Sequence, residues 1–77
     1  MLVQLNGESR KVRDQATLDD LVSELSLQPA QIAIELNKDV VRRGKWAETV
    51  LAEGDRIEIV HFVGGGEVSA EVSEARL

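Results

Sequence analysis

The sequence predicts an α+β fold in which a mixed sheet of four to five strands packs on one helix. Short segments that alternate between apolar and polar residues recur along the chain, and turn-forming residues separate them. A single segment ahead of the C-terminal tail carries apolar residues at the spacing of a helix face. With 77 residues, the chain has room for one domain with a small core.

The chain opens with a predicted hairpin. The apolar run of residues 2–5 ends at Asn6-Gly7, and Asn-Gly between extended segments is the strongest short-range signal of a tight hairpin turn. Residues 9–12 form the predicted return strand, which is polar and therefore belongs at or near a sheet edge.

A helix is predicted to begin at Thr17 and to stop near Leu27. Its apolar residues follow the spacing of one helix face and are Leu18, Leu21, Val22 and Leu25. Thr17 can cap the first turn, where the helix dipole also favours the negative charges of Asp19 and Asp20. Pro29 disfavours a helical conformation before it, so we expect the helix to end ahead of it.

The middle of the chain predicts two further strands. Residues 32–36 alternate as a strand does, residues 37–39 form a turn, and Val40-Val41 is a short extended piece. Residues 46–51 fit either one helical turn or a loop that Trp46 pins to the core.

The longest predicted strand covers residues 56–63 and follows a turn at residues 53–55. Both of its faces are apolar enough for the strand to lie inside the sheet. A central last strand and a single covering helix suggest a β-grasp fold. By analogy with that fold, the first and last strands should lie side by side and parallel.

Composition excludes several kinds of site. The chain has no cysteine, which excludes a disulfide, a thiolate zinc site, an iron–sulfur cluster and a thiol nucleophile. His61 is the sole histidine, so a multi-histidine metal site is excluded as well. A chain of 77 residues hardly encloses a deep substrate cavity. We therefore expect that the chain is not an enzyme and binds no cofactor itself.

The charge of the chain limits its partners. Nucleic-acid binding normally needs a basic stripe, whereas the net charge here is −5, which favours a protein partner with a basic surface. No signal peptide is visible, and no apolar run approaches the roughly 20 residues that span a bilayer. Since the absence of cysteine also fits a reducing compartment, we expect a cytoplasmic protein without a membrane partner.

The composition changes after Gly66, where an acidic tail of residues 67–77 begins. Val68 and Val72 lie four residues apart, but so short a segment forms no stable isolated helix in water. We predict a folded domain over residues 1–66 and a tail that is disordered or removed.

Residues 54–66 have the sequence GDRIEIVHFVGGG, which closely resembles the C-terminal end of the ThiS family, the ubiquitin-like sulfur carriers of thiamine biosynthesis. Earlier segments share the resemblance, namely Asn6-Gly7, residues 33–37, Val40-Val41, Arg43 and Trp46. The match covers residues 1–66, and the last strand with its glycines is its most specific part.

The resemblance implies a ubiquitin-like β-grasp and a defined chemistry. In this family, a partner adenylyltransferase of the ubiquitin-activating type uses ATP and magnesium to adenylate the carboxylate of the last glycine. A sulfur donor then converts the acyl-adenylate to a thiocarboxylate. A thiazole synthase takes that sulfur to build the thiazole ring.

Carried onto this chain, the resemblance makes Gly66 the reacting residue and Gly65 its neighbour in the arm. Because glycine has no Cβ, a Gly-Gly-Gly end can thread a narrow channel and leaves its carbonyl carbon unhindered. Residues that precede the reacting end are expected to contact the partner, and these are Gly64, Val63, Phe62 and Val60.

The chain departs from the family because it continues past the glycines, so a peptide-bonded Gly66 has no free carboxylate. Either a protease removes the tail, or the tail persists and the protein has lost carrier activity, or part of the tail is foreign to the protein. If cleavage follows Gly65 instead, Gly65 carries the carboxylate.

Two other functions stay open. The chain could be a sulfur carrier of another pathway, such as a molybdopterin, amino-acid or siderophore route. It could also be a β-grasp protein-interaction module whose glycines are never activated.

Several residues have a structural interpretation beside a functional one. His61 lies on the same predicted face as the strand's isoleucines, which favours a packed or rim histidine over a proton donor. Trp46 could anchor a partner, but a lone tryptophan in so small a chain more often closes the core. Arg42, Arg43 and Lys45 could dock an acidic surface, and a solvated loop explains them at least as well.

Overall fold

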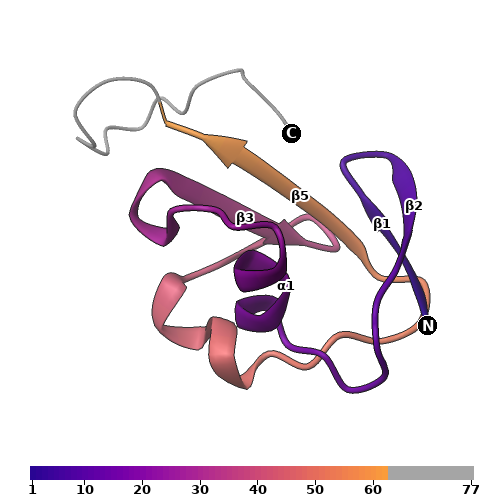
Figure 1. Ribbon diagram of the computed structural model, residues 1–77. Helices are drawn as coiled ribbons and strands as arrows, with labels where there is room; N and C mark the ends of the chain where they lie inside the picture. The colour runs from indigo at the N-terminus through magenta and orange to yellow at the C-terminus, as the bar shows by residue number, and fades with distance from the viewer. Residues whose placement is uncertain (63–77) are drawn as a thin grey trace.

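The computed structural model describes residues 1–62 (Figure 1). In chain order the elements are β1 (Leu2–Leu5), β2 (Glu8–Lys11), α1 (Leu18–Glu24), the 3-10 helix η1 (Pro29–Gln31), β3 (Ile32–Leu36), β4 (Asp39–Val41), the 3-10 helix η2 (Arg43–Glu48) and β5 (Arg56–His61). The predicted α+β class is thereby confirmed.

The five strands form one mixed sheet in the order β2-β1-β5-β3-β4. Strand β5 lies in the middle, between the β1–β2 hairpin on one flank and the β3–β4 hairpin on the other (Figure 1). It runs parallel to β1 and antiparallel to β3, so the predicted parallel pairing of the first and last strands is confirmed. A strand with neighbours on both sides is a firm base for whatever follows it.

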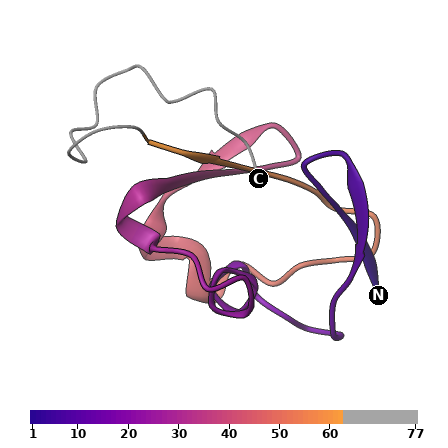
Figure 2. The same cartoon turned by 45° about the horizontal axis from the view of Figure 1, so that its top comes forward.

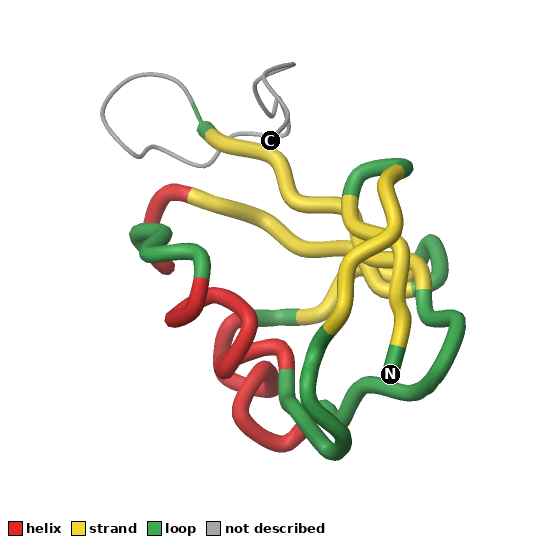
Figure 3. Tube along the Cα trace, turned by 45° about the vertical axis from the view of Figure 1, so that its right-hand side comes forward, coloured by secondary structure: helices red, strands yellow, loops and turns green. Residues whose placement is uncertain are grey.

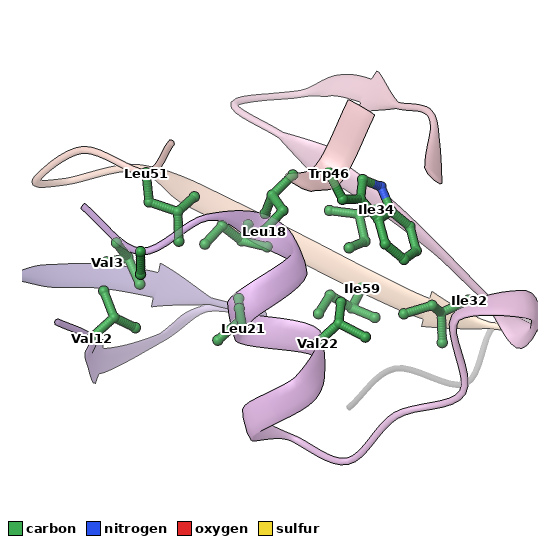
Figure 4. Close-up of a cluster of buried hydrophobic side chains, with 12 residues drawn as sticks. Val3, Val12, Leu18, Leu21, Val22, Ile32, Ile34, Trp46, Leu51 and Ile59 are labelled. Atoms are coloured by element: carbon green, nitrogen blue, oxygen red, sulfur yellow. The ribbon is translucent and has the colours of Figure 1, made fainter. Parts of the chain in front are cut away.

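The helix covers one face of the sheet. Figure 2 shows α1 beneath the sheet, and Figure 3 shows the helical segments gathered on the same side of the strands. The buried apolar residues between the two layers are Val3, Val12, Ala16, Leu18, Leu21, Val22, Ile32, Ile34, Trp46, Leu51, Ile57 and Ile59 (Figure 4). Burial of these side chains is the main stabilising contribution to the fold.

Helix α1 begins where the sequence predicts. Thr17 caps it, and a reciprocal capping box forms because the Asp20 nitrogen donates to Thr17 Oγ1 at 3.1 Å while the Thr17 nitrogen donates to Asp20 Oδ2 at 2.9 Å. The Thr17 backbone bond and the Arg13 side chain hold the pKa of Asp20 below its ordinary value.

The helix ends at Glu24, earlier than the predicted end near Leu27. Ser26 has φ 58, and the Leu27 nitrogen donates to the Val22 oxygen at 3.2 Å, as in a Schellman motif. A left-handed serine therefore ends the helix before the proline can. Pro29 begins η1 instead.

Other boundaries also differ slightly from prediction. Strand β4 begins at Asp39, which the sequence places in the turn, and β5 ends at His61, before the predicted end at residue 63. Strand β2 covers Glu8–Lys11 and not residues 9–12, although the Val12 nitrogen still donates to the Met1 oxygen at 2.9 Å. The segment from residue 46 lies in η2, which confirms the helical alternative as far as Glu48. Trp46 is 2% exposed and closes the core, as the structural interpretation predicts.

Candidate functional site

The predicted reacting end lies outside the described residues. Val63, the three glycines Gly64, Gly65 and Gly66, and the tail of residues 67–77 all belong to that part of the chain. The described part of the site is therefore the strand that leads to them, β5, and the neighbours that hold it.

Strand β5 presents different chemistry on its two faces. Ile57 and Ile59 are 1% and 0% exposed and point into the core beneath the sheet. Because side chains alternate along a strand, Val60 and Phe62 lie on the opposite face, where both are half-buried. These are the two described residues that the sequence assigns to partner binding, and the structure brings them together on the face away from α1.

A polar region adjoins this pair on the same face. Glu58 precedes Val60 by two residues, and its partner across the sheet is Glu35 in β3. Together with Lys38 and Arg56, these carboxylates line a shallow hollow in the surface. The face thus combines apolar side chains near the end of β5 with charges of both signs near its start.

The two flanks of β5 support it over different lengths. Strand β3 pairs with it over five residue pairs, from Leu36 opposite Ile57 to Ile32 opposite His61. The Phe62 nitrogen then donates to the Gln31 oxygen at 2.9 Å. Strand β1 pairs with β5 over two residue pairs, of which Leu5 opposite Ile57 is the later.

Beyond that point the Asn6 side chain takes over from β1. The Ile59 nitrogen donates to Asn6 Oδ1 at 2.8 Å, and Asn6 Nδ2 donates to the Ile59 oxygen at 3.2 Å. The Asn6 backbone nitrogen also donates to the Ile57 oxygen at 2.8 Å. One asparagine therefore satisfies three backbone groups of β5.

A second asparagine holds the other end of the strand. The Arg56 nitrogen donates to Asn37 Oδ1 at 3.0 Å, and Asn37 Nδ2 donates to Asp55 Oδ1 at 3.1 Å. Sequence reasoning identified Asn6 and Asn37 as turn residues and missed both of these roles. The spacing along the chain gives no sign of them, since Asn6 and Ile59 lie 53 residues apart.

Of the remaining candidate residues, His61 is the last residue of β5, and the three basic residues lie at the start of η2. His61 is half-buried, which agrees with a rim position. Arg42, Arg43 and Lys45 are exposed, and Lys45 Nζ lies 3.5 Å from Glu48 Oε2.

Within residues 1–62, no group of three or more acidic or histidine side chains could hold a metal ion. No helix of that part is long and apolar enough to cross a membrane.

The chain is similar to known proteins over the strand and the glycines that form the candidate site. The ThiS family matches residues 3–66, which include β5 and the glycines. The sulfur carrier protein ThiS of Bacillus subtilis is 39% identical over 66 residues, which are 84% of this chain and the whole of that protein. A thiazole synthase of Magnetococcus marinus is 45% identical over 67 residues, 87% of this chain.

The chain spans about a fifth of the length of the thiazole synthases it matches, namely 21% in Magnetococcus marinus and 22% in Paramagnetospirillum magneticum. Among solved structures, the crystal structure of the thiamine biosynthesis protein ThiS from Geobacter metallireducens has a TM-score of 0.75 and 29% identity. The similarity covers 84% of this chain and 99% of that one, which confirms the β-grasp fold. Relatives matched over their whole length are named carriers, so the prediction that the chain is not an enzyme is confirmed.

Proposed function

The chain belongs to the ThiS family, and we propose that it is a sulfur carrier of thiamine biosynthesis whose Gly66 carboxylate is adenylated and then converted to a thiocarboxylate. One observation carries the proposal: a central, two-sided strand leads directly to Gly-Gly-Gly, and the family match ends at that last glycine, residue 66.

The proposed chemistry explains why a carrier needs so little machinery. A carboxylate is a poor acyl donor, so its oxygen first attacks the α-phosphorus of ATP and releases pyrophosphate. The acyl-adenylate that forms is a good acyl donor, and hydrosulfide delivered by the sulfur donor attacks its carbonyl carbon, so that AMP and a proton leave and the thiocarboxylate remains. A partner of the ubiquitin-activating type supplies ATP, magnesium and the catalytic groups. The carrier supplies an unhindered carboxylate on a defined base.

The partner surface in this proposal is the glycine arm with Val60 and Phe62. Both side chains are half-buried, precede the arm in the sequence and, because side chains alternate along a strand, lie on the face of β5 opposite the buried isoleucines. Apolar side chains at the centre of a contact, with charged groups around them, are the usual composition of a protein interface. Glu35, Glu58 and Arg56 would then lie toward the edge of that contact.

The thiazole synthase partner has support from the relatives. Proteins named thiazole synthase contain a segment 45% and 34% identical to this chain, which fits an acceptor that works together with such a carrier. Carrier and acceptor would have to meet at the thiocarboxylate, so the same arm is proposed to enter both partners.

The proposal requires that residues 67–77 be removed, because only a C-terminal glycine has a free carboxylate. A processing protease is therefore a further proposed partner. Cleavage after Gly65 would leave Gly65 as the reacting residue, and the experiment below separates the two sites.

ATP–pyrophosphate exchange with the activating enzyme of the native host tests the proposal. Three chains are compared, ending at residues 65, 66 and 77. We expect exchange with the chain that ends at Gly66, and none with the full chain until a protease has acted on it. Exchange by none of the three would contradict the carrier function and favour a β-grasp interaction module. Exchange by the 65-residue chain alone would move the reacting carboxylate to Gly65.

A further inference from the structure

We propose that Asn6 is a positioning residue for the glycine arm: its side chain acts as a substitute strand that holds the far end of β5 in the plane of the sheet. The proposal deepens the proposed function, because it concerns how the arm is aimed. The claim that Asn6 holds the end of β5 can be tested without any partner protein.

The need for such a residue follows from the lengths of the strands. The pairing of β1 with β5 ends at Leu5 opposite Ile57, and the chain then turns away through Asn6-Gly7 into β2. Strand β5 continues to His61. Figure 1 shows β5 running past the tip of the β1–β2 hairpin. On that flank, the backbone groups of Ile59 would have no strand beside them.

The Asn6 side chain has the right chemistry to replace that strand. A carboxamide offers one acceptor and a donor side by side, as a peptide group does. Here it accepts from the Ile59 nitrogen at 2.8 Å and donates to the Ile59 oxygen at 3.2 Å. Ile59 is 0% exposed, so its backbone groups have little access to water. Buried peptide groups left without partners are costly, which makes this replacement important for the strand.

The backbone of Asn6 keeps the side chain in place. Its φ is 50, in the left-handed region that asparagine tolerates better than most residues, and its own nitrogen is bonded to the Ile57 oxygen at 2.8 Å. Backbone and side chain therefore bond Ile57 and Ile59, two residues of β5 that face the same flank and that a longer parallel β1 would bond there. Loss of the side chain would leave the strand end paired with β3 alone among residues 1–62.

Consequences for the arm follow from this geometry. With β3 as its one remaining neighbour, the end of β5 could rotate about that pairing, and the direction of the chain beyond Phe62 would vary. Small errors in the placement of a reacting group lower rates strongly, even when the group itself is unchanged. Asn6 is thus expected to influence activation without touching the reacting atoms.

The chain contains a matched control in Asn37. Both asparagines have positive φ, at 50 and 53, both begin a two-residue hairpin turn, and both accept a hydrogen bond from a backbone nitrogen of β5. They differ in position, because Asn37 holds Arg56 at the start of the strand and Asn6 holds Ile59 near its end. Asn6→Gly and Asn37→Gly keep the left-handed backbone accessible, so each removes the side chain with little strain on the turn.

Amide hydrogen exchange on the full 77-residue chain is the first test. The reporters are Val60 and Phe62, whose amides face β3 and whose own bonds neither substitution touches. Asn6→Gly should speed their exchange by about tenfold. This is the effect expected when the strand end loses the net stabilisation of roughly one hydrogen bond. Asn37→Gly should leave both rates unchanged. Asn6→Asp keeps the acceptor but loses the donor, so it should change the rates in the same direction as Asn6→Gly.

Adenylation kinetics are the second test, with each variant in the processed form in which the wild-type carrier is isolated. Asn6→Gly should lower kcat by about tenfold with little change in KM, since docking is retained and placement of the arm is lost. Asn37→Gly should keep the wild-type kcat.

Equal exchange rates at Phe62 in the two glycine variants, or equal kcat values, would overturn the assignment of Asn6. A wild-type chain that is never adenylated would instead contradict the proposed function, and the exchange comparison would still decide whether Asn6 holds the strand end.

Discussion

The two hairpins of this protein use the same kind of turn on either side of β5, and they differ in one residue. The first turn is Asn6-Gly7, with φ values of 50 and 86. The second is Asn37-Lys38, with φ values of 53 and 76. Positive φ at both central positions is what a type I′ hairpin turn requires. Glycine adopts that conformation freely, whereas a lysine in it is strained.

The comparison shows that the first residue of a turn can stabilise a neighbouring strand as well as the turn itself. Each asparagine bonds the backbone of β5, one near its end and one at its start. Glycine after Asn6 makes the first turn favourable by itself. The second turn contains a strained Lys38, so the rest of its hairpin must stabilise it. Four predictions sharpen or break this comparison.

The largest effect is expected where the second hairpin is anchored to the core. The Trp46 indole nitrogen donates to the oxygen of Val41, the last residue of β4, at 2.8 Å, and the ring is 2% exposed. Trp46→Ala should lower the free energy of unfolding by about 3–5 kcal/mol, because it leaves a large cavity in a small core. Urea denaturation followed by far-UV circular dichroism measures the loss.

Trp46→Phe is the control for that experiment. It keeps an aromatic ring but leaves the Val41 oxygen without its indole donor, for which we expect a cost of about 1–3 kcal/mol. A cost near zero would show that the second hairpin does not depend on this hydrogen bond, and the comparison of the two hairpins would lose its physical basis.

The next effect is expected at the first turn. Gly7→Ala should lower the free energy of unfolding by about 1 kcal/mol, because alanine disfavours the φ of 86 that this position adopts. A new Cβ would meet nothing within 4 Å, so the loss would come from the backbone and not from a clash. Gly44→Ala is the matched control, since that site is equally open and its φ lies outside the left-handed region. Equal losses at the two glycines would contradict the account.

A smaller effect of opposite sign is expected at the second turn. Lys38→Gly should raise the free energy of unfolding by about 0.5–1 kcal/mol, since it removes a side chain from a left-handed position with φ 76. Lys38→Ala removes the same charge but keeps the strain, so the difference between the two variants isolates the backbone effect. If both variants have the same thermal midpoint, the lysine is not strained.

The smallest effect is expected at the cap of α1. Its contact involves the titratable side chain of Asp20, whereas the two asparagine contacts with β5 are uncharged. The Thr17 backbone bond and Arg13 hold the pKa of Asp20 below its ordinary value of 3.8. A carboxyl with a lowered folded pKa contributes stability above its unfolded pKa and loses it as the pH falls through the folded one. The stability difference between wild type and Asp20→Asn should therefore shrink as the pH falls below 3.8. A difference that is independent of pH would contradict the charged capping box.

The sequence predicted those parts of the fold that depend on local signals. Asn-Gly marked the first turn, alternation marked β3 over Ile32–Leu36, and Thr17 marked the start of α1. The early end of that helix was missed because Ser26, a residue without a strong left-handed preference, takes the position where glycine is usual.

The candidate site was predictable only in part. Its glycines and the residues beside them follow from the family resemblance, and their roles stay predictions because Val63 and the glycines lie outside the described residues. The support from Asn6 could not be predicted, since the bond joins residues 53 positions apart and depends on where β1 stops relative to β5. Local patterns contain no information on such a pairing.

The most direct test of the central claim is the intact mass of the protein isolated from its native host. The mass is then measured again after incubation with ATP, magnesium, the host's activating enzyme and a sulfur donor. The account predicts a chain that ends at Gly66 and gains about 16 Da as sulfur replaces one carboxylate oxygen, the product of an activated acyl group. A mass that retains residues 67–77 and does not change on incubation would contradict it.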